Sequence, residues 1–162
     1  MTKLVKPQQK ILSEAPLLER LSRPRTQKLV FTNGVFDILH RGHVEYLYAA
    51  RTLGDELVVA INTDASVRRL KGKDRPINTD EDRALVLAGL GCVDYVTFFA
   101  DDTPQRLITA LLPDVLVKGG DYTPDSIVGR GVVESAGGQV VVIPFVTGKS
   151  TTQTLQKIRG SQ

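Results

Sequence analysis

The chain has 162 residues, of which 41% are hydrophobic and 24% charged, as expected for one globular domain with a proper core. The net charge of +3 is small and the basic residues are spread along the chain, which favours phosphorylated small molecules over nucleic acid as ligands. The single cysteine, Cys92, excludes an internal disulfide framework, and no apolar stretch approaches the roughly 18 residues of a membrane-spanning helix. We therefore expect a cytoplasmic protein that binds neither nucleic acid nor a membrane.

Residues 1–27 form an N-terminal extension rich in Lys, Gln, Arg and Pro, and we assign residues 28–162 to the domain proper. Between Pro7 and Pro24 five apolar side chains have the spacing of one weak helical face: Ile11, Leu12, Ala15, Leu18 and Leu21. An extension of this kind more often packs on its own domain or on a neighbouring subunit than takes part in chemistry.

The domain begins with the pattern of a strand, a helix and a second strand. Lys28 to Thr32 is a β run, Val44 to Leu53 has helical spacing, and Gly54 ends that helix. Leu57 to Ile61 is a continuous apolar run, typical of a strand buried on both faces of a parallel sheet. Together they predict a right-handed βαβ unit.

Both histidines of the chain, His40 and His43, lie at the predicted start of the first helix. Positions i and i+3 share one helix face, and the N–H groups of a first helical turn favour an anion. Gly42 leaves room for a phosphate to approach the backbone. The stretch therefore predicts a phosphate site with two imidazole donors. A metal site completed by Asp37 and a purely structural turn are the alternatives.

Asn62 to Asp64 follow the second strand, at the end where ligands of open α/β sheets bind. Asp64 is a candidate N-cap for a short helix through Leu70. Residues 68–76 hold five basic side chains in a stretch broken by glycine and proline. We interpret it as a mobile flap that closes over a triphosphate, with a solvated charged loop as the alternative.

The second half of the chain alternates helices and strands. Strands are predicted at Val93 to Phe99, Asp114 to Lys118 and Gln139 to Phe145, and helices at Thr79 to Gly91, Gln105 to Leu112, Ile127 to Ser135 and Gln153 to Ile158. This alternation predicts an α/β class, Rossmann-like, doubly wound fold with a mainly parallel five-stranded sheet and helices on both faces.

Two further stretches have the composition of ligand-binding turns. Gly119 and Gly120 after the fourth strand permit close approach of a ligand, and Asp121 is placed to accept hydrogen bonds from ribose hydroxyls, although a plain turn has the same sequence. Residues 149–152 (Lys-Ser-Thr-Thr) precede the last helix. They form either a second anion cradle or simple helix caps.

The stretch from Thr32 to His43 (TNGVFDILHRGH) resembles the HxGH signature of the nucleotidyltransferase superfamily. Longer stretches resemble one branch, the D-glycero-β-D-manno-heptose 1-phosphate adenylyltransferases: residues 32–44, 62–72, 75–78, 102–108 and 114–122. The similarity extends over about residues 28–160. It implies adenylyl transfer from ATP to the heptose 1-phosphate, giving ADP-heptose and pyrophosphate for the lipopolysaccharide core. Some members carry a fused sugar kinase, which 162 residues cannot accommodate, so we expect a separate kinase upstream.

The resemblance also implies roles for individual residues. The catalytic candidates, which contact the phosphates, are His40, His43, Lys71 and Arg83. The nucleotide-binding candidates are Thr32, Asn33, Gly34, Phe36, Gly42, Gly119, Asp121, Lys149, Ser150, Thr151 and Thr152. The candidates for the sugar, chosen by their position at strand ends, are Asp37, Asn62, Asp64 and Lys118. Alternatively, Arg83 is a surface cation and Lys118 a structural ion-pair partner. Mg²⁺ with ATP and a homo-oligomer are also implied.

Two other functions compete with this interpretation. The first is a cytidylyltransferase for glycerol- or choline-type phosphates, but Phe145 to Thr147 stand where several of those enzymes carry an arginine before Ser-Thr-Thr. The second is a non-catalytic nucleotide-binding module, which a degraded HxGH stretch would favour. A redox Rossmann domain is excluded because no Gly-x-Gly-x-x-Gly follows the first strand.

Overall fold

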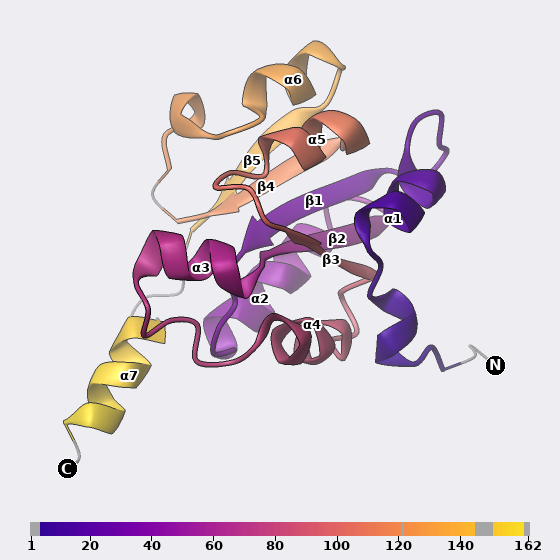
Figure 1. The fold of residues 1–162 in the computed structure, drawn as a ribbon. Helices are drawn as coiled ribbons and strands as arrows, with labels where there is room; N and C mark the ends of the chain where they lie inside the picture. The colour runs from indigo at the N-terminus through magenta and orange to yellow at the C-terminus, as the bar shows by residue number, and fades with distance from the viewer. Residues whose placement is uncertain (1–3, 121, 145–150, 161–162) are drawn as a thin grey trace.

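A five-stranded parallel sheet forms the centre of the structure, a computed structural model that describes residues 4–120, 122–144 and 151–160 (Figure 1). Its strands are β1 (Leu29–Gly34), β2 (Glu56–Asn62), β3 (Tyr95–Phe99), β4 (Val115–Gly119) and β5 (Gln139–Ile143). Their order is β3-β2-β1-β4-β5, and each neighbouring pair is parallel. The predicted doubly wound α/β fold is confirmed, and the strand order reverses between β1 and β4.

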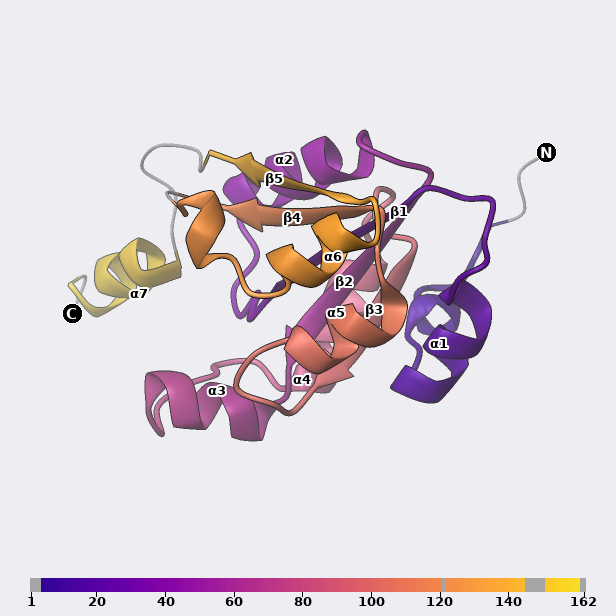
Figure 2. The same cartoon turned by 90° about the horizontal axis from the view of Figure 1, so that it is seen from above.

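Helices cover both faces of this sheet (Figures 1 and 2). One face packs on α2 (Arg41–Arg51) and α4 (Asp80–Ala88), and the other on α1 (Glu14–Leu21), α5 (Gln105–Leu111) and α6 (Arg130–Ser135). The strands are apolar on both faces. Along β1, Val30 lies in the cluster with Leu47 of α2, whereas Phe31 lies in the cluster with Ile108 of α5. This continuous burial explains why the strands read as unbroken apolar runs.

The remaining helices lie outside these two layers. They are the 3₁₀ turns η1 (Pro7–Lys10) and η2 (Pro124–Ser126), and the helices α3 (Asp64–Lys71) and α7 (Thr151–Arg159). In both views α3 and α7 lie on the side toward which the strands point, where ligands of such sheets bind (Figures 1 and 2). No helix within the described part of the chain is long and apolar enough to cross a membrane.

Several predicted boundaries shift because capping residues lie elsewhere. α2 begins at Arg41 instead of Val44, since His40 is its N-cap. α3 has Thr63 as its N-cap instead of Asp64, and the Thr63 hydroxyl accepts from the Ser66 N–H at 3.4 Å. Other elements shift by a few residues at one end or the other: α4 ends at Ala88, β3 starts at Tyr95, α6 starts at Arg130 and α7 starts at Thr151.

The N-terminal extension packs on the sheet of its own chain. Ile11 forms a parallel bridge to Val96, next to edge strand β3, and Lys10 Nζ donates to the carbonyls of Leu90 and Val93. The predicted helical face was partly wrong. Leu17 is buried in place of Ala15, because α1 turns Leu17 and Leu21 toward α5.

Candidate nucleotide site

The start of α2 stacks the two imidazole rings on each other. The ring centroids of His40 and His43 lie 3.9 Å apart at an interplanar angle of 26°. His40 Nδ1 accepts from the Gly42 N–H at 3.1 Å, and His43 Nδ1 accepts from the His40 N–H at 3.3 Å. Because each Nδ1 accepts a hydrogen bond, the neutral form of each ring carries its hydrogen on Nε2. The helix start therefore provides two imidazoles in the same tautomer.

His43 is kept uncharged by its surroundings. Burial, with a smaller repulsion from His40, lowers the pKa of His43 to about 4. The ring of Phe36 packs edge-on against it, with centroids 5.3 Å apart. At neutral pH the side chain of His43 is therefore a neutral hydrogen-bond donor and not a cation.

Phe36 reaches this position through an unusual backbone conformation. Its φ angle is +50°, in the left-handed region that non-glycine residues rarely adopt. The ring lies over Gly34, where an added Cβ would come within 2.9 Å of Phe36 Cε2. Strain of this kind persists where the surroundings determine it, often at functional sites. Gly34 and Phe36 were both predicted to bind nucleotide. In the structure the Phe36 ring packs between Gly34 and the His43 ring.

The carboxylate of Asp37 accepts hydrogen bonds from other groups of the protein. Its carboxylate is 1% exposed and accepts from Arg75 Nε at 2.7 Å and from the N–H groups of Ile77 and Asn78 at 2.9 Å. Burial alone would raise the pKa of Asp37, but the hydrogen bonds from Asn78, Ile77 and Arg75 outweigh it and lower the pKa. Its proposed contact with the sugar does not agree with this geometry.

The described contacts bear on the alternative metal site and on the predicted flap, both of which stay interpretations of the sequence. No group of three histidine, cysteine, aspartate or glutamate side chains within the described ranges is arranged to hold a metal. Of the predicted flap, Arg68 to Lys71 belong to α3, and Arg75 is tied to Asp37. Residues 68–74 are all exposed, whereas Arg75 and Pro76 are half-buried. Lys71 is the last residue of α3 and lies within this exposed segment.

Arg83 is buried and joins four segments at the carboxyl ends of β1 and β2. Its side chain is 0% exposed. Nε donates to the Asn78 carbonyl at 3.1 Å, and Nη1 donates to the Val35 carbonyl at 2.7 Å. Nη2 donates to the Asn62 carbonyl at 2.9 Å and to Asp64 Oδ1 at 2.8 Å. Arg83 is therefore not a surface cation, and its guanidinium is engaged by protein acceptors in place of the expected phosphates.

Two other polar candidates likewise serve the protein interior. Asn62 is buried and its Nδ2 donates to Ser66 Oγ at 3.0 Å. Thr32 is fully buried, and its hydroxyl lies 2.6 Å from that of Tyr46 of α2. Burial raises the pKa of Tyr46 to about 12. Asn62, Thr32 and Asp64 therefore bond to other protein groups, namely Ser66, Tyr46 and Arg83, at the carboxyl ends of the strands.

Lys118 and Asn33 meet across the point where the strand order reverses. Lys118 Nζ donates to Asn33 Oδ1, and it lies 6.0 Å from the centre of the Tyr122 ring. Burial lowers the pKa of Lys118 to about 8. The alternative role of Lys118 as an ion-pair partner does not hold among the described residues, where it forms no ion pair.

Of the second predicted anion cradle, the structure describes Thr151 and Thr152. Thr151 Oγ1 at the start of α7 donates to the Ile38 carbonyl at 3.4 Å, which brings α7 to the loop before His40. Thr152 is exposed, and Gly42 and Gly119 are half-buried. Three more of the predicted nucleotide-binding residues lie outside the described residues: Asp121, Lys149 and Ser150.

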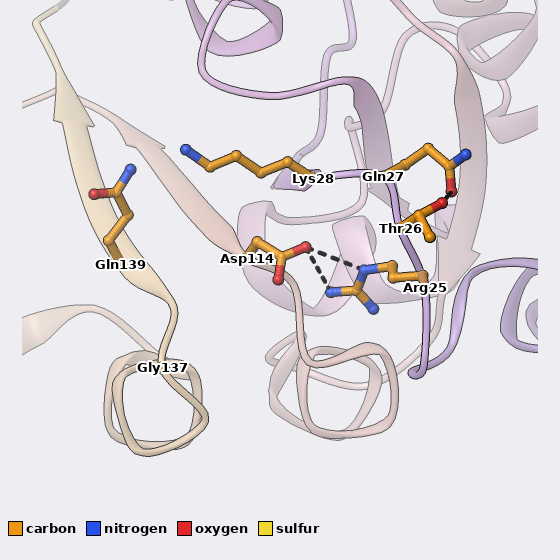
Figure 3. A pocket seen from close by; sticks show the side chains of 7 residues that line it. All are labelled: Arg25, Thr26, Gln27, Lys28, Asp114, Gly137 and Gln139. Atoms are coloured by element: carbon orange, nitrogen blue, oxygen red, sulfur yellow. Dashed lines mark hydrogen bonds and ion pairs between the residues drawn. The ribbon is translucent and has the colours of Figure 1, made fainter.

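A cavity of about 420 Å³ lies at the opposite end of the strands and is not the site (Figure 3). It is lined by Arg25, Thr26, Gln27, Lys28, Asp114, Gly137 and Gln139. Asp114 there accepts from Arg25 and from the Leu29 N–H, so the main charges are already paired. A smaller cavity of about 100 Å³ lies between Phe36, Leu39 and Val86, next to the imidazoles.

The parallel sheet and the paired imidazoles at a helix start agree with the resemblance to the nucleotidyltransferases of the HxGH type. A family model described as cytidylyltransferase-like matches residues 31–156, and the chain belongs to this family. The chain is 57% identical over 150 residues to the bifunctional protein HldE of Geotalea uraniireducens, and this match covers 93% of the chain and 31% of the relative. It is 54% identical over 154 residues to the bifunctional protein HldE of Vibrio cholerae, covering 94% of the chain and 32% of the relative. The chain thus spans about a third of the length of these curated relatives.

Solved structures give the same fold. A lipopolysaccharide core biosynthesis protein from Thermoplasma volcanium is 30% identical with a TM-score of 0.62, and the match covers 76% of this chain and 100% of that one. Pantothenate synthetase from Thermus thermophilus is 22% identical with a TM-score of 0.56, covering 85% of this chain and 62% of that one. The second likeness concerns the fold alone.

The structure also contains site features that the sequence did not reveal. These are the left-handed Phe36, the anchoring of Arg75 and Asn78 on Asp37, and the contact between Thr32 and Tyr46. Only the last has a sequence signal, because Tyr46 lies three residues from His43 on the buried side of α2.

Proposed function

We propose that this chain transfers an adenylyl group from ATP to D-glycero-β-D-manno-heptose 1-phosphate, giving ADP-heptose and pyrophosphate. This is a step in the synthesis of ADP-heptose for the lipopolysaccharide core. The identity of 54–57% to bifunctional HldE proteins over most of the chain supports it, together with the likeness to a lipopolysaccharide core biosynthesis protein. The observation that carries the proposal is the stacked imidazole pair at the start of α2.

The chemistry requires no general base. A sugar phosphate is largely dianionic at pH 7, since its second pKa is roughly 6. Its oxygen attacks the α-phosphorus of ATP, a new P–O bond forms, and the bond to the bridging oxygen breaks. Pyrophosphate leaves with the electron pair, and no proton has to be moved. The Nδ1 contacts and the lowered pKa of His43 suit donors and not bases.

The protein's task is then electrostatic, because an anion attacks a phosphate that is itself anionic. His40 and His43 donate from Nε2 to α- and β-phosphate oxygens, where charge develops in the transition state. The first turn of α2 and the start of α7 at Thr151 offer two further anion-binding helix ends. Lys71, at the end of α3, and the predicted residues Lys149 and Ser150 hold the departing β- and γ-phosphates. The nucleotide-binding roles of Asn33, Gly42, Gly119, Asp121 and Thr152 belong to the same proposal.

Magnesium enters as part of the substrate, bound to ATP. Mg²⁺ keeps several waters and is usually bound by phosphates with few protein groups. The described residues provide no cluster of their own for a metal, which suits an ion that arrives on the phosphates. Homo-oligomerisation and a cytoplasmic location stay predictions from the sequence.

Pyrophosphate release tests the proposal. The chain is incubated with Mg²⁺ and either ATP or CTP, and with either heptose 1-phosphate or glycerol 3-phosphate. We expect release only from ATP with heptose 1-phosphate. Release from CTP with glycerol 3-phosphate would retain the phosphate site but replace the substrates. If no pair releases pyrophosphate while ATP still binds, a non-catalytic nucleotide-binding module becomes the better description.

A further inference from the structure

The buried and half-buried arginines in the ion pairs below differ from the half-buried Lys118 in how their charge is balanced. Arg25 lies 3.0 Å from Asp114, Arg75 lies 2.7 Å from Asp37, and Arg83 lies 2.8 Å from Asp64. Each arginine therefore has a carboxylate partner. Lys118 does not. Within the ranges that the structure describes, its ammonium contacts an amide oxygen and faces an aromatic ring.

The described groups around Lys118 provide no counter-charge. On β1, its partner Asn33 is neutral, and on β5 the residue paired with it is Val142. In the loop after β4 the described neighbour is Tyr122. Asp121, the nearest acidic residue in sequence, lies outside the described residues. Holding an ammonium in such surroundings without a carboxylate is unfavourable, and groups whose pKa is shifted by burial cluster at functional sites.

The position of Lys118 agrees with a ligand. It lies near the carboxyl end of β4 beside β1, at the reversal of strand order where open α/β sheets bind their ligands. Because successive side chains alternate along a strand, Lys118 shares the sheet face of Leu116, which packs with α5 and α6. The imidazoles begin α2, which covers the other face of the sheet.

We propose that Lys118, oriented by Asn33, binds the phosphate of the acceptor substrate, a sugar phosphomonoester. This inference rests on the proposed function and deepens it, since it separates the acceptor subsite from the nucleotide subsite and moves Asn33 from the second to the first. In-line displacement requires the attacking oxygen and the departing pyrophosphate to lie on opposite sides of the α-phosphorus. The proposal places the acceptor at Lys118 and the triphosphate at the starts of α2 and α7, with α2 on the sheet face opposite to that of Lys118.

The proposal predicts a pH window for acceptor binding. The acceptor phosphate is dianionic above roughly pH 6. Lys118 is charged below its pKa of about 8 and neutral above it. The value of kcat/KM for the acceptor should therefore rise through about pH 6 and fall through about pH 8. In a variant without this lysine, kcat/KM for the acceptor should no longer fall as the pH rises through about 8.

Steady-state kinetics test the assignment by separating the two substrates. Lys118→Met should raise the KM for heptose 1-phosphate by about 10- to 100-fold, the range expected for one charged hydrogen bond, and leave the KM for ATP within about twofold. Lys118→Arg, which keeps the charge, should recover part of the loss. Lys28→Met, which removes an exposed lysine at the other end of the sheet, should change neither constant. An unchanged acceptor KM in Lys118→Met would overturn the proposal.

A titration of the lysine itself does not depend on turnover. In the full chain with ¹³C-labelled lysine, the Lys118 signal is identified by its loss in Lys118→Met, and its pKa should be about 8. Heptose 1-phosphate, or inorganic phosphate at higher concentration, should raise this pKa, whereas ATP should not. A pKa near the ordinary lysine value in the free protein, a rise with ATP alone, or no response to any phosphate would each contradict the proposal. If phosphate raises the pKa but no acceptor is turned over, the proposed function fails and the phosphate subsite stands.

Discussion

Two neighbouring regions at the carboxyl end of the sheet differ in whether their buried polar groups are paired with opposite charges. Around Arg83 and Asp37, buried charges are paired and their hydrogen bonds hold loops together. Around His43 and Lys118, no opposite charge among the described residues offsets burial, and both pKa values are lowered. The first region is a framework and the second is a site, because only unbalanced donors have capacity left for phosphate oxygens. This difference yields four stability predictions.

The largest effect should come from Arg83→Met, which removes the guanidinium that joins four segments. It leaves Asp64 without its partner and three carbonyls without a donor. We expect a loss of about 3–5 kcal/mol in the free energy of unfolding, measured with urea at pH 7. Arg41→Met is the control, since it breaks an ion pair whose arginine is 73% exposed and should cost less than about 0.5 kcal/mol. A loss below about 1 kcal/mol for Arg83→Met would mean that the framework does not depend on this residue.

Asp37→Asn should destabilise the chain by about 2–3 kcal/mol at pH 7, because an amide cannot replace the charged acceptor of Arg75. The lowered pKa of Asp37 gives the pH dependence: its stabilisation is complete above the unfolded value of about 3.9 and is lost as the pH falls through the folded value. The gap between wild type and variant should therefore narrow in acid. Asp125→Asn, at a carboxylate that is 95% exposed, is the matched control and should show neither effect.

His43 should make the protein sensitive to acid over a defined range. Its folded pKa of about 4 lies below the unfolded value of 6.5, so the unfolded chain binds more protons between these values and the native state loses stability as the pH falls. For a half-buried ring we expect the loss to be on the order of 1 kcal/mol. His43→Gln should lack it. Urea unfolding at pH 7 and pH 4.5 measures the difference, and identical pH dependence in both proteins would contradict the neutral-imidazole assignment.

Lys118→Met should have the smallest effect and the opposite sign. Because the folded pKa of about 8 lies below the model value of 10.5, wild type gains stability as the pH rises between the two. The variant removes this penalty, so it should be more stable at pH 7 by on the order of 1 kcal/mol, and the gain should vanish near pH 10.5. Thermal unfolding at both pH values, with Lys28→Met as the control, measures it. A destabilised Lys118→Met would place Lys118 in the framework.

Hydrophobic patterning was sufficient to predict the fold. The apolar runs of β2 and β4 and the alternation of strands with helices predicted the parallel sheet, and the spacing of His40 and His43 predicted their common face. The meeting of Lys118 with Asn33 also follows from the fold, since doubly wound order places the fourth strand beside the first. These features depend on local periodicity and on topology.

The framework could not be predicted in this way. A charged residue opposite an apolar stripe is normally on the surface, and the burial of Arg83 depends on carbonyls 21 and 48 residues away in sequence. The pairing of Asp37 with Arg75 joins residues 38 positions apart. The positive φ of Phe36 could not be predicted from the sequence either, because glycine is the residue that normally adopts such a conformation. Tertiary contacts determine all three.

The imidazole pair gives the most direct test, because the proposed chemistry depends on two imidazole donors at the start of α2. The measurement is the single-turnover rate of pyrophosphate release by His40→Ala and His43→Ala, with ATP affinity measured in parallel. We predict that each substitution lowers the rate by about 10²–10³-fold while ATP affinity changes by less than about tenfold. Turnover close to wild type in either variant would contradict the assignment of that histidine to the transition state.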